Sequence, residues 1–145
     1  MAQTAELTKK LEETLRRANT TLFKRGRSIL VGMEISALQF NALLTIREFG
    51  PLTMGDLGKH LFVACSTATD LADRMERASL VERVRDDKDR RTVRLQLLTR
   101  GDEALDAVIT ERQNFVGEVL EDYTDEEYSV LLRGLEILAQ RMELK

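Results

Sequence analysis

Residues 53–97 contain the pattern that most constrains how this chain can fold. Two short helical segments, about 54–60 and 64–78, are separated by only three or four residues, which is the spacing of a helix-turn-helix. The segment 93–97 then alternates apolar and polar residues, as a half-buried strand does, and 80–85 is its expected partner. The connection between these strands holds three aspartates, two arginines and a lysine. The order predicts a helix-turn-helix followed by a β-hairpin whose tip projects into solvent.

Capping boxes mark where helices start elsewhere in the chain. In this motif a hydroxyl side chain is followed three residues later by an acid or amide, and the two cap backbone N–H groups at the helix start. The helix that starts at Ser36 is expected to stop at Gly50-Pro51, because glycine can take a left-handed conformation and proline cannot continue a helix. The four pairs are Ser36 with Gln39, Thr53 with Asp56, Thr99 with Asp102, and Thr124 with Glu127.

Both ends of the chain carry apolar stripes at helical spacing. The first stripe predicts a helix over about 5–30, the second a helix from about Arg100 to Asp122, and the last a helix with a heptad-like seam. Part of the second and third stripes must pack within the subunit, and we expect the rest of them to form a dimer. The stripes are Leu7, Leu11, Leu15, Ala18 and Leu22; Leu105, Val108, Ile109, Phe115, Val116, Val119 and Leu120; and Tyr128, Leu131, Leu135, Leu138 and Met142.

The net charge of −3 conceals an uneven distribution along the chain. Residues 1–73 are nearly neutral, residues 74–100 carry nine basic and five acidic side chains, and residues 101–145 carry four basic and twelve acidic ones. A basic middle suits a protein that presents one face to phosphate. The alternative is an ordinary solvated, charged surface.

The second helix of the motif has a small, polar outer face near its start. The first residues of a helix that enters the major groove approach base edges, and its free N–H groups suit phosphate. Helical hairpins of this kind also occur as plain core elements, so the following strands are what favour DNA binding. The shared core is expected to be Leu57, Leu61, Val63, Ala68, Leu71, Ala72 and Met75, which leaves Ser66, Thr67, Thr69, Asp70, Asp73 and Arg74 outside.

The hairpin tip presents cations rather than apolar side chains. Arginine gains from the negative potential of a narrow minor groove, so a projecting Arg91 is a reasonable minor-groove probe. Asp89, two residues earlier, could hold that guanidinium in one orientation. A protein-binding tip would be expected to show apolar residues, whereas this one shows Lys88, Arg90 and Arg91.

Over essentially its whole length the chain resembles the MarR (multiple antibiotic resistance regulator) family of winged-helix transcription factors. The wing signature of that family is an Asp, any residue, an Arg, and then a strand ending in Leu-Thr and shortly a Gly. In this chain the residues that resemble the signature are Asp89, Arg91, Leu98-Thr99 and Gly101. The resemblance implies that Arg91 enters the minor groove, that Asp89 orients it, and that the helix over 64–78 reads the major groove.

Four features depart from the family pattern. Leu97-Leu98-Thr99 is one residue longer than the usual spacing, Ala64 stands where a capping Ser or Asp is usual, and Ser79 stands where a helix-ending glycine is usual. Asp70 occupies a position that is more often basic or neutral, although a carboxylate there can accept a hydrogen bond from cytosine N4. These departures bear on the contact map more than on the function.

We therefore expect a mainly α protein with a small β-wing, forming a single MarR-like domain over 1–145. The winged-helix DNA-binding part is about 36–99, and about 1–30 and 100–145 form the helical dimerisation part, which the resemblance implies interlocks between subunits. The expected function is that of a homodimeric transcriptional repressor on a palindromic operator, with half-sites about 34 Å apart. The expected DNA-binding residues are Ser66, Thr67, Thr69, Asp70, Arg74, Lys88, Asp89, Arg90 and Arg91.

The resemblance also implies release from DNA by a small-molecule effector that lodges between the dimer helices and the winged domain. Candidates for lining such a pocket are Phe23, Phe40, Leu44 and Phe115, for which ordinary core packing is the alternative. Two other functions stay open: a winged-helix protein-interaction module without DNA binding, and a redox-sensing regulator. The latter would act through Cys65, which otherwise reads as a small buried or half-buried residue.

No enzyme, cofactor or metal site is expected. The sequence has no glycine-rich phosphate loop and no nucleophile elbow, and its one cysteine and one histidine are too few for a structural zinc site. His60 is expected to close the first helix of the motif. No apolar run approaches the roughly 20 residues that cross a bilayer, and the N-terminus lacks a signal-peptide pattern, so a cytoplasmic protein without membrane contact is expected.

Overall fold

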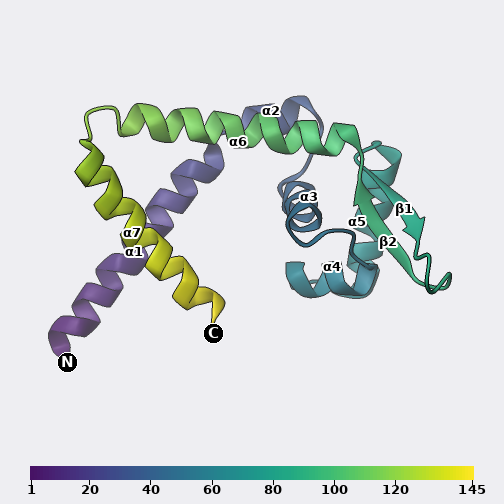
Figure 1. The fold of residues 1–145 in the computed structure, drawn as a ribbon, viewed down its shortest axis with the longest axis horizontal. Coiled ribbons are helices and arrows are strands. Elements are labelled where there is room, and N and C mark those ends of the chain that lie inside the picture. The colour runs from purple at the N-terminus through teal and green to yellow at the C-terminus, as the bar shows by residue number, and fades with distance from the viewer. The chain divides into compact units, whose positions relative to one another are not determined.

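The computed structural model describes residues 1–145 as seven helices and one two-stranded antiparallel sheet (Figure 1). The expected mainly α fold with a small β-wing is confirmed. Contacts divide the chain into two compact units, Met1–Glu111 and Arg112–Lys145. The elements are α1 (Ala2–Lys24), α2 (Arg27–Gly32), α3 (Ala37–Phe49), α4 (Met54–Leu61), α5 (Cys65–Arg77), β1 (Val81–Arg85), β2 (Val93–Leu97), α6 (Thr99–Val119) and α7 (Asp125–Glu143).

The prediction of a single N-terminal helix over about 5–30 is wrong, because the helix is interrupted between α1 and α2. Gly26 takes a left-handed φ of 80°. A Cβ built at this position would lie 2.8 Å from Cγ1 of Val108, so the backbone here packs directly against α6. This close approach to a residue far along the chain is invisible to the apolar periodicity of the first 30 residues.

Three of the four capping pairs cap helices as expected. At the start of α3 the Ser36 hydroxyl accepts from the Gln39 N–H at 3.1 Å, and the Gln39 side chain accepts from the Ser36 N–H at 2.8 Å. The Thr53 and Thr124 hydroxyls cap α4 and α7 by accepting from the N–H groups of Asp56 and Glu127 at 3.1 and 3.2 Å, but only the Ser36 pair forms the complete, reciprocal capping box. The end of α3 at Gly50, with φ 80°, is also as expected.

The fourth pair was assigned wrongly, since α6 begins at Thr99 itself and not after it. The carbonyl of Leu98 accepts from the Gly101 and Asp102 N–H groups at 3.0 and 3.2 Å. The N–H of Leu98 is in turn donated to the Leu80 carbonyl at 3.0 Å. The chain is thus already anchored by its backbone one residue before the threonine.

The core of the first unit lies between α3, α4, α5, α6 and the sheet. Burying one large apolar side chain completely contributes about 1.5–3 kcal/mol to the free energy of unfolding. Of the core expected around the helix-turn-helix, Leu61 and Val63 are only partly buried and the other five residues are buried. The largest fully buried side chains are Phe40, Leu43, Leu57, Met75, Leu80, Leu95, Leu105, Val81 and Val108.

The two strands form a regular hairpin that is tied to the helices at its base. Val81 pairs with Leu97 and Arg85 with Val93. The segment after α3 joins the same sheet, because Leu52 and Leu95 exchange both backbone hydrogen bonds, at 3.2 and 2.7 Å. In Figure 1 the strands extend outward from the first turn of α6 and end in a narrow loop.

The end of α5, the start of β1 and the start of α6 meet at a tight junction, here called the Leu80–Gly101 junction. Ser79 takes a left-handed φ of 60°, and Leu80 donates its N–H to the Met75 carbonyl at 3.0 Å. The backbone of Gly101 comes so close to the Leu80 carbonyl that no Cβ would fit between them. Only glycine is therefore compatible with this packing.

Neither α1 nor α7 buries a single residue within the chain. Most of the apolar stripe residues expected on these helices are exposed, for example Leu7 at 60% and Leu135 at 48%, and the others, Leu15, Leu22 and Leu138, are half-buried. Long helices owe most of their stability to packing of an apolar face, so such faces call for a partner.

No helix taken singly has both the length and the apolar character needed to cross a membrane. The segments Ala2–Gly32 and Ala37–Phe49 meet those criteria only as a pair, bent by 101° at the break between them. Buried core helices and N-terminal leader sequences meet the same criteria.

Candidate nucleic-acid interface

The outer face of α5 is small and polar at its start, and four of its five candidate DNA-binding residues are exposed. These are Ser66, Thr67, Asp70 and Arg74. The fifth, Thr69, is half-buried, and its hydroxyl donates to the Cys65 carbonyl at 2.9 Å. The N-cap of α5 is Ala64, which supplies no side-chain cap, so the first N–H groups of the helix have no side-chain acceptor. Such groups suit a phosphate oxygen.

An ion-pair bracket joins α5 to the wing. Arg83 of β1 donates to the Asp73 carboxylate at 2.6 Å and to the Glu76 carboxylate at 2.9 Å, while its backbone N–H donates to Glu76 at 3.0 Å. The hydrogen bond to Asp73, assisted by Glu76, raises the pKa of the Arg83 guanidinium against the opposing effect of burial. We call this set the Arg83 bracket.

Sequence reasoning missed the Arg83 bracket. The helical spacing predicts that Asp73 faces outward and that Arg83 lies in a strand, but it does not predict that the two side chains meet. The available signal was the spacing of Asp73 and Glu76, which lie on one helix face three residues apart and directly precede a strand that carries an arginine.

Internal hydrogen bonds give the wing loop, residues 86–92, a defined conformation. The Asp86 carboxylate accepts from the Lys88 N–H at 2.9 Å and from Arg94 Nε at 3.3 Å. These two contacts, the backbone one first, lower the pKa of Asp86. Arg85 donates to the Arg90 carbonyl at 2.8 Å. Two of the basic residues, Arg85 and Arg94, are therefore used to hold the loop itself.

The remaining cations of the wing point into solvent. Arg91 is 94% exposed, and Asp89 accepts from its backbone N–H at 3.1 Å and from its Nε at 3.4 Å. The side chains of Lys88 and Arg90 are exposed and make no hydrogen bond or ion pair within the chain. The tip thus presents three positive charges, one of them restrained by a carboxylate.

Known proteins with this arrangement identify the family. The MarR family model matches residues 35–93, from two residues before α3 to the first residue of β2. The HTH-type transcriptional regulator YsmB of Bacillus subtilis is 40% identical over 135 residues, which cover 93% of this chain and 92% of that protein. A MarR family protein from Bacillus stearothermophilus is 43% identical, with a TM-score of 0.85 over 95% of this chain and 96% of that one. The chain belongs to the MarR family.

A third comparison concerns a MarR-like fold that was solved with DNA. The structure of FabT from Streptococcus pneumoniae in complex with DNA has a TM-score of 0.77 and 26% identity, covering 95% of this chain and 99% of that one. The MarR family consists of helix-turn-helix transcriptional regulators and not of enzymes, in agreement with the sequence-based prediction.

The turn between the helices of this MarR-family chain carries an exposed aromatic ring. Phe62 adopts a left-handed conformation, φ 57° and ψ 40°, and is 95% exposed. The turn is tight, since Val63 donates its N–H to the Gly58 carbonyl at 2.9 Å and a Cβ at Gly58 would lie 2.9 Å from the Val63 carbonyl oxygen. Phe62 lies in the predicted turn, but nothing in the sequence pattern indicates that its ring is exposed to solvent.

Cys65 and His60 flank this turn. The expectation that Cys65 is buried or half-buried is wrong: it is the first residue of α5, where the side chain faces solvent, and its thiol is exposed and free. His60 lies in the last turn of α4 as expected, and its ring stacks on Phe49 with a centroid separation of 4.3 Å.

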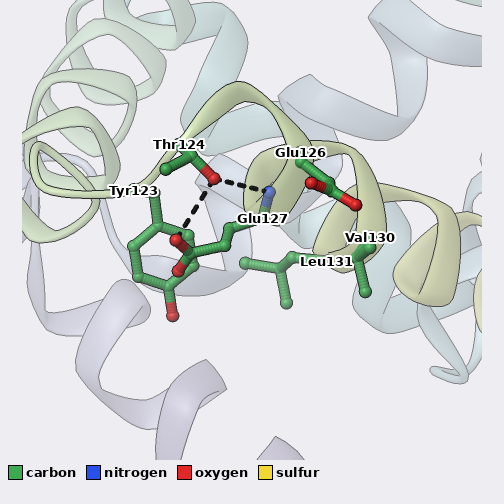
Figure 2. A pocket seen from close by; sticks show the side chains of 6 residues that line it. All are labelled: Tyr123, Thr124, Glu126, Glu127, Val130 and Leu131. Carbon is green, nitrogen blue, oxygen red and sulfur yellow. Dashed lines mark hydrogen bonds between the residues drawn. The ribbon is translucent and has the colours of Figure 1, made fainter.

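Two surface depressions of the MarR-family chain involve none of the four effector-pocket candidates. One, of about 650 Å³, lies at the start of α7 and is drawn in Figure 2. There the Thr124 hydroxyl and the Glu127 carboxylate are 3.2 Å apart and serve the helix cap. The other, of about 300 Å³, lies beside Arg47 and Gln96. Phe40 is a core residue and Leu44 packs against the core, so core packing accounts for these two.

No group of three or more histidine, cysteine or acidic residues gathers closely enough to hold a metal ion.

Proposed function

We propose that this MarR-family chain is a homodimeric repressor that binds a palindromic DNA operator. The observation that carries the proposal is Arg91, fully exposed at the tip of a hydrogen-bonded wing and restrained by Asp89. An arginine held in this way suits the narrow minor groove, where the negative potential is strongest. The DNA-bound FabT structure, a relative at 26% identity, supports double-stranded DNA as the partner.

The candidate contact residues divide by role. The start of α5 is proposed to face base edges in the major groove, with Arg74 further along the helix toward phosphate. Lys88 and Arg90 are proposed to neutralise phosphates, and Asp89 to position Arg91. The full proposed set is Ser66, Thr67, Thr69, Asp70, Arg74, Lys88, Asp89, Arg90 and Arg91.

The unburied faces of α1 and α7 support a dimer. A homodimer with two-fold symmetry repeats the same contacts on two half-sites, so its operator is palindromic, with half-site centres about 34 Å apart on one face of DNA. A DNA-binding regulator acts where the chromosome lies, so action in the cytoplasm is part of the proposal.

Repression and release by a small molecule complete the proposal. A ligand can shift the dimer away from its DNA-bound spacing only if it binds the two spacings with different affinity. Phe23 and Phe115 stay as candidates for its site. The protein-interaction alternative is disfavoured by the cationic wing tip, and the redox alternative rests on the exposed Cys65 thiol alone.

The test is fluorescence anisotropy of the purified protein with a duplex selected from a random pool and with the DNA upstream of its own gene, each at two salt concentrations. Arg91→Ala should weaken specific binding by about 1–3 kcal/mol, whereas Lys88→Ala should mainly reduce the salt dependence, by a slope of about 1. If neither variant changes the affinity for DNA or its salt dependence, the wing is not part of the DNA interface. Failure to select any duplex would favour the protein-interaction module.

A further inference from the structure

Phe62 is an aromatic residue that the fold does not use. Among the large hydrophobic side chains its 95% exposure is exceeded only by that of the terminal Met1. Its backbone is left-handed, a conformation that bulky residues rarely adopt. Glycine or asparagine would close α4 in the same turn without exposing an apolar ring. The ring therefore brings no benefit to folding that a smaller residue would not bring.

The position of Phe62 puts this ring beside the proposed major-groove contacts. Three peptide units separate Phe62 from Cys65, the first residue of α5, so their Cα atoms lie at most about 11 Å apart. The major groove is about 12 Å wide. Of the neighbouring side chains, Val63 is half-buried, whereas Ala64, Cys65 and Ser66 are small and exposed. Phe62 is thus the largest exposed side chain in the turn that precedes the start of α5, the end that is proposed to approach the bases.

At the start of α5 the exposed apolar groups that could contact a base are the Phe62 ring and the methyl groups of Ala64 and Thr67, and the ring is the largest of them. The first basic side chain of the helix is Arg74, about two and a half turns after its start, so no arginine is available here to pair with guanine. The Thr69 hydroxyl is already bonded to the Cys65 carbonyl. Aromatic side chains distinguish bases in the major groove chiefly by contact with the C5-methyl group of thymine.

We propose that Phe62 reads a thymine in each half-site by packing its ring against the C5-methyl group in the major groove. The proposal rests on the proposed DNA-binding function, and it adds a specificity-determining residue outside α5 and the wing.

The experiment compares wild type with Phe62→Gly on the duplex that wild type selects from a random pool. Each thymine is replaced in turn by deoxyuridine, which removes the methyl group and nothing else. Phe49→Ala, which removes another exposed phenylalanine ring, is the control variant, and thermal unfolding and sedimentation accompany every variant.

We expect wild type to lose affinity about fourfold at one thymine per half-site, the loss that burial of one methyl group supports. Phe62→Gly should bind the unmodified duplex on the order of tenfold more weakly and should be insensitive to deoxyuridine at that thymine. Its unfolding temperature should equal or exceed that of wild type, because the left-handed turn suits glycine.

Three results would overturn the proposal. Phe62→Gly could bind as tightly as wild type, or it could keep the same sensitivity to deoxyuridine. It could also change the sedimentation mass, which would assign the ring to a subunit contact. In each case intact Arg91-dependent binding by wild type leaves the proposed function standing, whereas absence of any selected duplex overturns both.

Discussion

Ser79 shows how a single residue can carry strain in this fold. It closes α5 with φ 60°, and the N–H groups of Ser79 and Leu80 bond back to Glu76 and Met75 at 3.0 Å each. Hydrogen bonds of this type usually accompany glycine at this helix-ending position, because residues with a Cβ are disfavoured in the left-handed region. Ser79 is also the position at which the family pattern has a helix-ending glycine.

Ser79→Gly should raise the free energy of unfolding by about 0.5–1 kcal/mol, the relief of left-handed strain less the extra freedom of the unfolded chain. The same substitution at Ser129, inside α7, is the control and should destabilise by a similar amount. Urea denaturation of both variants measures the difference. A stability loss at Ser79 would show that its hydroxyl matters more than its backbone.

Asp86 makes the conformation of the wing loop dependent on pH. Its pKa is lowered by the Lys88 N–H and by Arg94, so the ionised carboxylate stabilises the folded loop. This contribution is present at neutral pH and is lost as the pH falls through the lowered pKa of Asp86, below the ordinary aspartate range. In an NMR titration, the Lys88 amide should therefore shift at a lower pH than the amide of an unstructured aspartate peptide. Asp86→Asn should abolish that shift.

Residue-level prediction worked where a local pattern decides the structure and failed where exposure decides it. Ser36, Thr53 and Thr124 cap helices through atoms three residues away, and the sequence contains all the partners. Whether Cys65 or Phe62 faces solvent depends on how α4 and α5 pack, which no spacing in the sequence expresses.

At the scale of elements, the helix-turn-helix and the wing were predictable because their helices and strands follow one another with short connections. The first helix was predicted too long, since the break at Gly26 depends on its contact with Val108 in α6. The Arg83 bracket was missed for a similar reason: it joins two elements whose pairing becomes visible only in three dimensions.

The Arg83 bracket fixes how α5 and the wing lie relative to each other, so Arg83→Met should affect DNA binding more than stability. Partly exposed ion pairs contribute little, and we expect a loss of about 1 kcal/mol in the free energy of unfolding. Specific affinity for DNA should fall more than tenfold at constant salt, because α5 and the wing have to be oriented correctly for the proposed major-groove and minor-groove contacts to form together. Anisotropy and denaturation on the same preparation test this.

Arg47→Met is the matched control for the Arg83 bracket. Arg47 joins α3 to Asp106 of α6 at 2.7 Å and lies in no proposed DNA contact. Equal losses of affinity in the two variants would indicate a general weakening of the fold rather than a role in positioning.

At the scale of the whole molecule, the exposed apolar faces of α1 and α7 predict a dimer. Wild type should sediment at twice 16.5 kDa. Leu135→Glu, which places a charge within the α7 stripe, should shift the protein toward the monomer and weaken operator binding, since the two half-sites are then bound separately. Leu144→Glu, beyond the end of α7, is a control that should leave the dimer intact. A monomeric wild type would contradict the dimer proposal.

The Leu80–Gly101 junction couples α5 and the wing, the two elements that are proposed to contact DNA. Backbone hydrogen bonds join the last turn of α5, the start of β1 and the segment that leads into α6, and the contact between Gly101 and the Leu80 carbonyl leaves no room for a Cβ. A tilt of the first turn of α6 should therefore rotate α5 and the wing together. If the proposed function holds, a ligand or a distant mutation that tilts the first turn of α6 should therefore move the proposed major-groove and minor-groove contacts together rather than one at a time.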